Sequence, residues 1–291
     1  MSTRTITLST TQIQALKQQL HDATICKTPP YAHYQIKTSE CVITAYQSGK
    51  VVFQGNGADY YADALETKTT SPTTKKTLSQ YPQCGSDEVG TGDYFGPVVV
   101  AASYVTQEDI EWLSPLGIQD SKAIDDEKIR QLGPILMEKL PHSLLILNNQ
   151  KYNQIHKTNN MNAIKAKLHN QAYLHLEKKL TTLPEFCIID QFTPKTSYFK
   201  YLQKEPNVIR QLHFETKAES KYMSVACSSI IARYVFLLSF DAMQQRYDFS
   251  FPKGAGKQVD NSIIKFVQQF GKKELENVAK LHFANTQKAG I

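Results

Sequence analysis

The chain carries two hydrophobic patterns that are separated by a polar break. Residues 67–77 consist of Thr, Lys, Ser and one Pro, without a strongly apolar residue, which is typical of a linker. Before the break, apolar side chains recur at helical spacing, at Ile13, Leu16, Leu20 and Ile25. We expect a helix there that is capped by Thr10 or Thr11 and stopped by Pro29.

Runs of β-forming residues follow this helix. Residues 31–37, 41–47 and 50–54 alternate partly between apolar and polar positions, which predicts three strands. Residues 58–65 have the pattern of a short helix that returns over them. The region before the break is therefore expected to be a small α+β domain with an antiparallel sheet.

Tyrosines and lysines lie on the predicted strands of this small domain, at Tyr34, Tyr46, Lys37 and Lys50. Aromatic rings stack on bases and lysines neutralise phosphates, so these residues suit a nucleic-acid-binding face. In the alternative, the rings only cover the sheet and the lysines are solvated. The strand register decides between the two, so we name no site residue in this domain.

After the break, strand patterns alternate with helical ones, which is typical of an α/β domain. Strands are predicted at residues 83–89, 97–105, 143–148, 186–190 and 208–214. Helices are predicted at residues 162–179, 220–240, 259–270 and 272–281. The predicted organisation is an N-terminal domain at residues 1–65, a linker at residues 66–80 and a larger domain at residues 81–291.

Residues 87–97 combine adjacent acids with glycines and a proline between apolar stretches. Neighbouring carboxylates such as Asp87 and Glu88 repel, and burial beside a strand adds a desolvation penalty that a cation relieves. Glycines let a ligand approach the main chain closely. This pattern indicates an active site with a divalent metal, and the alternative is a solvated acidic hairpin.

Two further acids stand where a site would need them. Asp190 ends the apolar strand predicted at residues 186–190, and strand ends of α/β sheets commonly bind ligands. Glu219 lies where the long helix of residues 220–240 is predicted to begin. In the alternative, Asp190 is only a cap or turn residue after its strand, and Glu219 only interacts favourably with the dipole of the helix. Four carboxylates suit Mg²⁺ or Mn²⁺, and two such ions about 4 Å apart promote in-line displacement at phosphorus.

Composition adds a preference for polyanionic partners. The net charge is +6 and the pI is near 8.9, which favours nucleic acid. Five scattered cysteines without a CxxC spacing argue against a disulfide framework or a zinc site. The polar N-terminus and the absence of a run of about 18 apolar residues lead us to expect a cytoplasmic protein that binds no membrane.

Other side chains with catalytic potential lack the spacing that their chemistry needs. We expect His169, His213 and His282 to be structural, because they lack the paired spacing of a zinc protease. No GxSxG elbow of a serine hydrolase occurs in the sequence.

Residues 87–97 resemble the first motif of the type 2 ribonuclease H family, and residues 90–95 have the form found in its ribonuclease HIII branch. Further motifs resemble that family in its order, at residues 120–122, 161–171, 217–220 and 253–256. The resemblance covers residue 81 to the end. The N-terminal domain resembles the TATA-binding-protein-like domain that precedes the catalytic domain in that branch.

The resemblance implies an RNase H-like mixed sheet flanked by helices. It also implies endonucleolytic cleavage of the RNA strand of an RNA/DNA hybrid, which leaves 3′-hydroxyl and 5′-phosphate ends. By motif position, the catalytic residues and the ligands of Mg²⁺ or Mn²⁺ would be Asp87, Glu88, Asp190 and Glu219. The substrate-binding residues would be Gly90, Thr91, Gly92, Lys122 and Lys217.

Thr91 is where this sequence differs from the ribonuclease HII pattern, which has a basic residue between the two glycines. We therefore expect cleavage within ribonucleotide tracts and weak incision at a single ribonucleotide embedded in DNA. We also expect a monomer whose N-terminal domain binds the hybrid. The alternatives are a metal-dependent DNA nuclease or resolvase with the same carboxylates, and a binding module without turnover.

Overall fold

The computed structural model describes residues 2–20, 23–66, 81–118 and 124–291. The chain divides into two compact units, one formed by residues 1–76 with 193–197 and the other by residues 77–192 with 198–291. Residues 67–80, which make up nearly all of the predicted linker, lie outside the described part of the chain. The domain boundaries at residues 65 and 81 therefore stay predictions.

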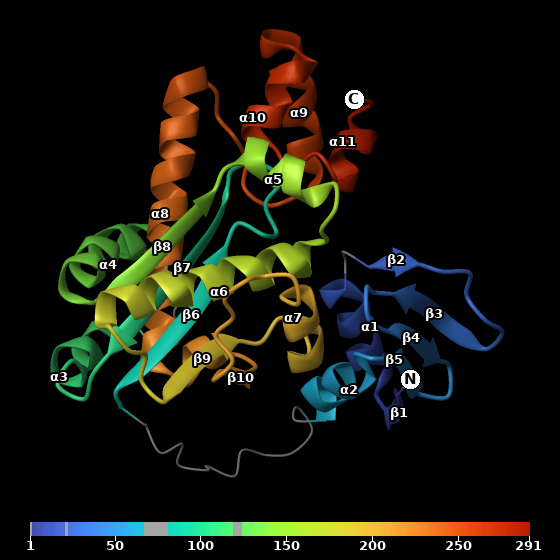
Figure 1. Cartoon of the computed structure of the whole chain (residues 1–291). Coiled ribbons are helices and arrows are strands. Elements are labelled where there is room, and N and C mark those ends of the chain that lie inside the picture. Colours follow the sequence, from blue (N-terminus) through green and yellow to red (C-terminus); the bar gives the residue numbers. More distant parts are fainter. Residues whose placement is uncertain (1, 21–22, 67–80, 119–123) are drawn as a thin grey trace. The chain divides into compact units, whose positions relative to one another are not determined.

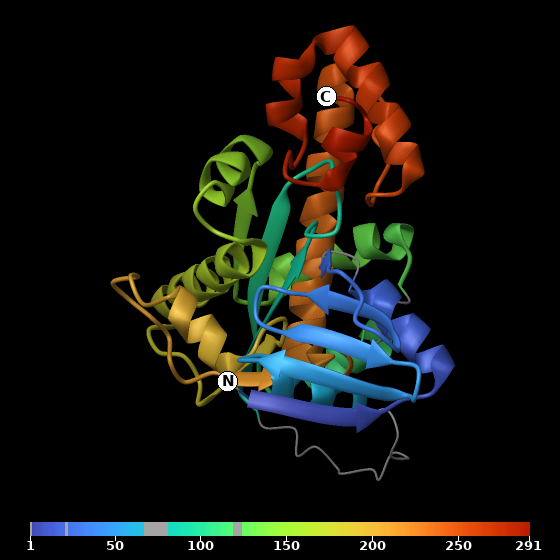
Figure 2. The ribbon, with the colours of Figure 1, turned by 90° about the vertical axis from the view of Figure 1, so that its right-hand side faces the viewer.

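The N-terminal unit is an antiparallel five-stranded sheet with the strand order β1-β5-β4-β3-β2. Its strands are β1 (Ser2–Thr7), β2 (Thr24–Ile25), β3 (Ala32–Lys37), β4 (Val42–Tyr46) and β5 (Lys50–Gly55). Its helices are α1 (Thr10–Gln19) and α2 (Ala58–Glu66), and Figure 2 shows the sheet face-on. The small α+β domain is thus confirmed.

Helix α1 differs from its prediction at both ends. Ser9 caps it, since its hydroxyl accepts a hydrogen bond from the Gln12 amide while the Gln12 side chain accepts one from the Ser9 amide. The helix ends at Gln19, and Ile25 belongs to β2. Strand pairing with β3 therefore overrides the apolar spacing that predicted a longer helix.

The tyrosines of this sheet lie on opposite faces. Tyr34 is buried in the core, and its hydroxyl donates a hydrogen bond of 2.9 Å to the Ile13 carbonyl of α1. Of the two alternatives left open for Tyr34, the structure therefore shows the one in which its ring covers the sheet. Tyr46, Lys37 and Lys50 share the opposite face by strand alternation, and both lysines are exposed.

The larger unit is a mixed sheet with the strand order β10-β9-β6-β7-β8. Its strands are β6 (Gln83–Val89), β7 (Val98–Val105), β8 (His142–Leu147), β9 (Phe186–Asp190) and β10 (His213–Glu215). Strands β6, β7 and β8 pair antiparallel, whereas β9 runs parallel to both β6 and β10. The strand predicted at residues 208–214 was wrong in extent, because only its end joins the sheet.

Helices cover both faces of this sheet, with α6 on one and α8 on the other (Figure 1). The α-helices after residue 81 in the described part of the chain are α3 (Ile110–Leu113), α4 (Asp126–Lys139), α5 (Asn149–His156), α6 (Met161–Leu180), α7 (Lys195–Tyr201), α8 (Met223–Tyr247), α9 (Lys257–Phe270), α10 (Leu275–Val278) and α11 (Ala284–Lys288). Along β7, alternate residues enter the two cores, Val99 with α8 and Val100 with α6. The predicted mixed sheet flanked by helices is confirmed.

Helix α8 is the central helix of the core. Among the described residues it is the one helix long and apolar enough to cross a membrane, and 72% of its apolar window is buried inside the protein. Gly85 of β6 permits its close approach, because a Cβ atom there would lie 2.4 Å from the Val225 amide nitrogen. The helix therefore packs directly on the strand that carries the acid pair.

Candidate active site

Asp87 and Asp190 lie at neighbouring strand ends on the same face of the sheet. Strand β9 runs parallel to β6 with Ser86 opposite Ile189, so the next residues along are the two aspartates. Strand alternation places both on the face that α8 covers. The sequence predicted each strand end, and the pairing of the strands brings the two carboxylates together.

The Asp87 carboxylate is buried, with 8% of the residue exposed. Burial and the negative charges of Glu88 and Asp190 raise the pKa of Asp87 well above its usual value. Hydrogen bonds from Ser229 and from the Glu88 amide, the latter 2.7 Å long, oppose this shift. This aspartate is therefore held in a position where negative charge is unfavourable.

Glu219 lies beside Asp190, in a 3₁₀ turn (Ala218–Ser220) that precedes α8. The Ala218 amide donates a hydrogen bond of 2.9 Å to Oδ1 of Asp190, which ties this turn to the end of β9. Glu219 is buried, with 4% exposed. The prediction that it opens the long helix was wrong, since α8 begins only at Met223.

Glu88 faces α6, on the opposite side of the sheet from its neighbour Asp87. Lys165 forms an ion pair with Oε1, and His169 Nε2 lies 2.8 Å from Oε2. Burial would raise the pKa of Glu88, but Lys165 and His169 lower it to about 2. The carboxylate is therefore ionised and held by two partners.

Lys165 was not predicted as a contact of the site, and His169 was expected to be structural. His169 Nδ1 lies 2.8 Å from the Ser86 hydroxyl, so this predicted structural histidine bridges two residues of β6. Phe192 stacks on the His169 ring at 5.3 Å and lies under the Lys165 ammonium at 4.0 Å. The signal was their spacing of four residues on one helix face, inside the motif at residues 161–171.

The donor set suits a hard divalent cation, since it consists of carboxylate oxygens that crowd one another. Burial is the main cause of the raised pKa of Asp87, and the neighbouring charges of Glu88 and Asp190 add to it. Across the described ranges, however, no three His, Cys, Asp or Glu side chains already stand in a metal-holding arrangement. The contacts of Glu88 with α6 give one reason, because they turn its carboxylate away from the aspartates. The metal roles of the four acids stay predictions.

The glycine-rich turn after β6 has two glycines with positive φ, Gly90 and Gly96, and Gly90 is the more tightly enclosed. Gly90 has φ +93°, and a Cβ atom there would lie 2.2 Å from the Pro97 carbonyl oxygen. Gly92 is exposed, and no atom lies within 4 Å of the place where its Cβ would be. Thr91 is half-buried. The exposed backbone at Gly92 is thus open to close approach by a ligand.

The second half of this turn is tied to distant segments. Oδ1 of Asp93 accepts a hydrogen bond of 2.6 Å from the Gly254 amide, and the Tyr94 amide donates one of 2.9 Å to the Gly254 carbonyl. The motifs at residues 87–97 and 253–256 therefore meet in space, which their separation in the sequence did not show.

The two predicted substrate lysines have different outcomes. Lys217 is exposed, with φ +54°, directly before the turn that carries Glu219. Lys217 thus lies next to the turn that carries one member of the group Asp87, Asp190 and Glu219, which we call the acid cluster, and its role as a substrate contact stays a prediction. Lys122 lies outside the described residues.

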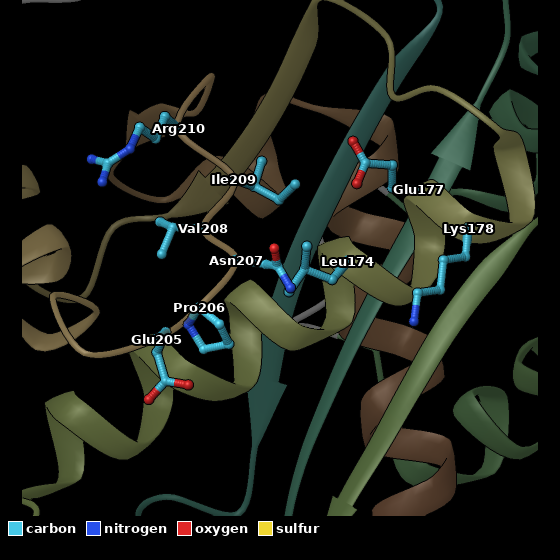
Figure 3. Close-up of a pocket in the computed structure, with 9 residues that line it drawn as sticks. All are labelled: Leu174, Glu177, Lys178, Glu205, Pro206, Asn207, Val208, Ile209 and Arg210. Carbon is cyan, nitrogen blue, oxygen red and sulfur yellow. The ribbon is translucent and has the colours of Figure 1, made fainter.

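A cavity of about 550 Å³ lies between α6 and residues 205–210 (Figure 3). Leu174, Glu177 and Lys178 line it from the helix, and Arg210 lines it from the segment across from that helix (Figure 3). None of the predicted site residues lines it. The cavity is therefore not part of the predicted active site.

Known proteins resemble the chain along its whole length. The profile of the Ribonuclease HII family matches residues 84–286, and that of a domain of unknown function (DUF3378) matches residues 4–78. The ribonuclease HIII of Bacillus mycoides (strain KBAB4) is 43% identical over 300 residues, which cover 98% of this chain and 96% of that protein. The ribonuclease HIII of Bacillus anthracis (strain CDC 684 / NRRL 3495) is 42% identical with the same coverage.

Solved structures share the fold. The crystal structure of Bst-RNase HIII in complex with Mn²⁺ superposes with a TM-score of 0.71 at 39% identity, over 99% of this chain and 98% of that one. Aquifex aeolicus RNase H3, at 21% identity and a TM-score of 0.57 over 96% and 99%, shares the fold. By sequence, by fold and by the order of its motifs, the chain belongs to the ribonuclease HIII branch of the type 2 ribonucleases H.

Proposed function

We propose that this protein is an endoribonuclease that hydrolyses the RNA strand of RNA/DNA hybrids and leaves 3′-hydroxyl and 5′-phosphate ends. The observation that carries the proposal is that buried Asp87 and half-buried Asp190 are neighbours near the ends of two parallel strands, while the turn with buried Glu219 is tied to Asp190. Water attacks phosphorus and the bond to the 3′ oxygen breaks. No observation favours the DNA nuclease alternative.

Divalent cations, Mg²⁺ or Mn²⁺, are the cofactors that this donor set implies, with two ions during catalysis. Bound there, they would lower the pKa of a water and stabilise the leaving oxygen. Asp87, Asp190 and Glu219 would hold them, and Glu88, whose carboxylate contacts Lys165 and His169 in this structure, is the fourth expected ligand. The binding of Mn²⁺ by the related Bst-RNase HIII supports this choice.

Substrate recognition would use two surfaces. At the acid cluster, the amides of Gly90 and Gly92 and the Thr91 hydroxyl would meet ribose 2′-hydroxyls, which distinguish RNA from DNA. In the N-terminal unit, the face with Tyr46, Lys37 and Lys50 would bind the duplex backbone and bases. The positive net charge of the chain supports both contacts.

The test is cleavage of an RNA/DNA hybrid whose two strands carry different labels, with Mg²⁺ or Mn²⁺. We expect only the RNA strand to be cut, and its 3′ ends to be extendable by a polymerase. Duplex DNA of the same sequence should stay intact. Cleavage of the DNA strand would support the resolvase-like alternative, and binding without turnover would support the non-catalytic one.

A further inference from the structure

Lys280 is a fully buried lysine that binds main-chain carbonyls of the glycine-rich turn. Its exposed fraction is 0%, and its Nζ donates hydrogen bonds of 2.8 Å to the Asp93 carbonyl and 2.6 Å to the Gly96 carbonyl. Its amide donates a third, of 2.8 Å, to the Tyr94 carbonyl. One residue that follows α10 thus contacts three of the four residues 93–96.

This arrangement is unfavourable for a charged side chain. Burial lowers the pKa of Lys280 to about 7, and only the charge of Asp93 opposes the shift. The hydrogen-bond acceptors of the ammonium are neutral carbonyls, and the carboxylate of Asp93 instead accepts from Gly254. Such a group destabilises a core relative to an apolar side chain of the same size, so a functional requirement is the simplest reason for its presence.

The two carbonyls that Lys280 contacts differ in their other side-chain partners. The Asn149 side chain also donates to the Gly96 carbonyl, at 2.8 Å, and the Gly96 amide donates to Val278 at 2.9 Å. Without Lys280, the Gly96 carbonyl would therefore keep its bond from Asn149, and the Gly96 amide would keep its bond to Val278. The Asp93 carbonyl has Lys280 as its side-chain donor, and Asp93 directly follows Gly92.

We propose that Lys280 is a positioning residue that fixes the Asp93 carbonyl and thereby presents Thr91 and Gly92 to the ribose 2′-hydroxyl of the substrate. The inference rests on the proposed function of this site. Lys280 itself would not touch the substrate and would act only through the Asp93 carbonyl. Its loss leaves the acid cluster intact and lets the exposed half of the turn change its conformation.

The test compares Lys280→Met, which keeps the volume and removes the donors, with Lys280→Gln, which keeps a shorter donor. Lys178→Met, at an exposed position on α6, is the matched control. Affinities for an RNA/DNA hybrid and for DNA duplex of the same sequence are measured without divalent metal. We expect the hybrid-to-DNA affinity ratio to fall roughly tenfold or more in Lys280→Met, less in Lys280→Gln and not in the control.

Two further measurements separate positioning from a general structural role. The melting temperature of Lys280→Met should stay within a few degrees of the wild type, and KM for the hybrid should rise more than kcat falls. An unchanged ratio, an equal loss on both duplexes, or a failure of both variants to fold would overturn the proposal. A wild type without any preference for the hybrid would instead overturn the proposed function on which it rests.

Discussion

The Lys165 ammonium forms an ion pair with Glu88, and the two side chains have only 10% and 11% of their surface exposed. The pair lies on the α6 face of the sheet, whereas Asp87, the residue before Glu88, lies on the α8 face. The two adjacent acids are therefore not equivalent. Asp87 stands beside other carboxylates, and Glu88 stands beside cationic and imidazole partners.

Loss of Lys165 should destabilise the protein strongly. In Lys165→Met, Glu88 would keep a buried charge without its ion pair, and we expect the free energy of unfolding to fall by about 3–5 kcal/mol. Adding Glu88→Gln to Lys165→Met should restore much of the lost stability. Chemical denaturation of the wild type, the two single variants and the double variant would measure this. Additive effects of the two changes would contradict a direct pair.

The stability of the folded protein at acid pH should depend on Glu88. Its pKa is lowered from 4.5 to about 2 in the folded protein, so its contribution is present above pH 4.5 and is lost as the pH falls from 4.5 towards 2. Wild type and Glu88→Gln should therefore converge in stability over that interval. Thermal melts at several pH values would test this, and a constant difference between the proteins would count against it.

Asp87→Asn should separate activity from stability. The raised pKa of Asp87 means that its charge destabilises the metal-free fold, so the variant should melt at the same temperature as wild type or higher. Hydrolysis should fall by roughly 100- to 1,000-fold or more, the scale of losing one group that stabilises the transition state. Stabilisation of the folded protein by Mn²⁺ should also weaken. A fully active variant would refute the site.

Thr91 should limit cleavage at isolated ribonucleotides. A hybrid tract offers several 2′-hydroxyls, whereas one embedded ribonucleotide offers a single contact, and we expect rates roughly 10- to 100-fold lower there, equivalent to one or two hydrogen bonds. Thr91→Arg should raise incision at the single site relative to the tract. Equal wild-type rates on the tract and on the single ribonucleotide would show that Thr91 does not limit incision at isolated ribonucleotides.

The open face of the N-terminal sheet should bind substrate electrostatically. Replacing both Lys37 and Lys50 by Ala should weaken hybrid binding and reduce the slope of log affinity against log salt by roughly one for each phosphate that a lysine no longer neutralises. Tyr34→Phe is the control, because its hydroxyl binds Ile13 in the core and its loss should change stability alone. An unaltered salt slope in the double variant would exclude this face from binding.

The periodic elements could be predicted from the sequence. Strands β6, β7 and β9 and helix α6 appear within a residue or so of their predicted bounds, because their apolar patterns agree with the cores that bury them. Errors occurred where pairing or packing overruled the local pattern. Ile25 joins a strand, and residues 208–212 stay outside the sheet. Strand β1, rich in threonine, was missed because it presents few apolar positions.

The sequence by itself determined the local chemistry: the acid pair, the glycine-rich turn that follows it, the aspartate at the end of a strand, and the family whose motifs these are. The tertiary structure alone decided which face each acid takes and which partners it meets. His169 lies 81 residues from Glu88, and Lys280 lies 184 residues from Gly96. Such contacts depend on strand order and helix packing, which bring distant side chains together without leaving a spacing between them in the chain.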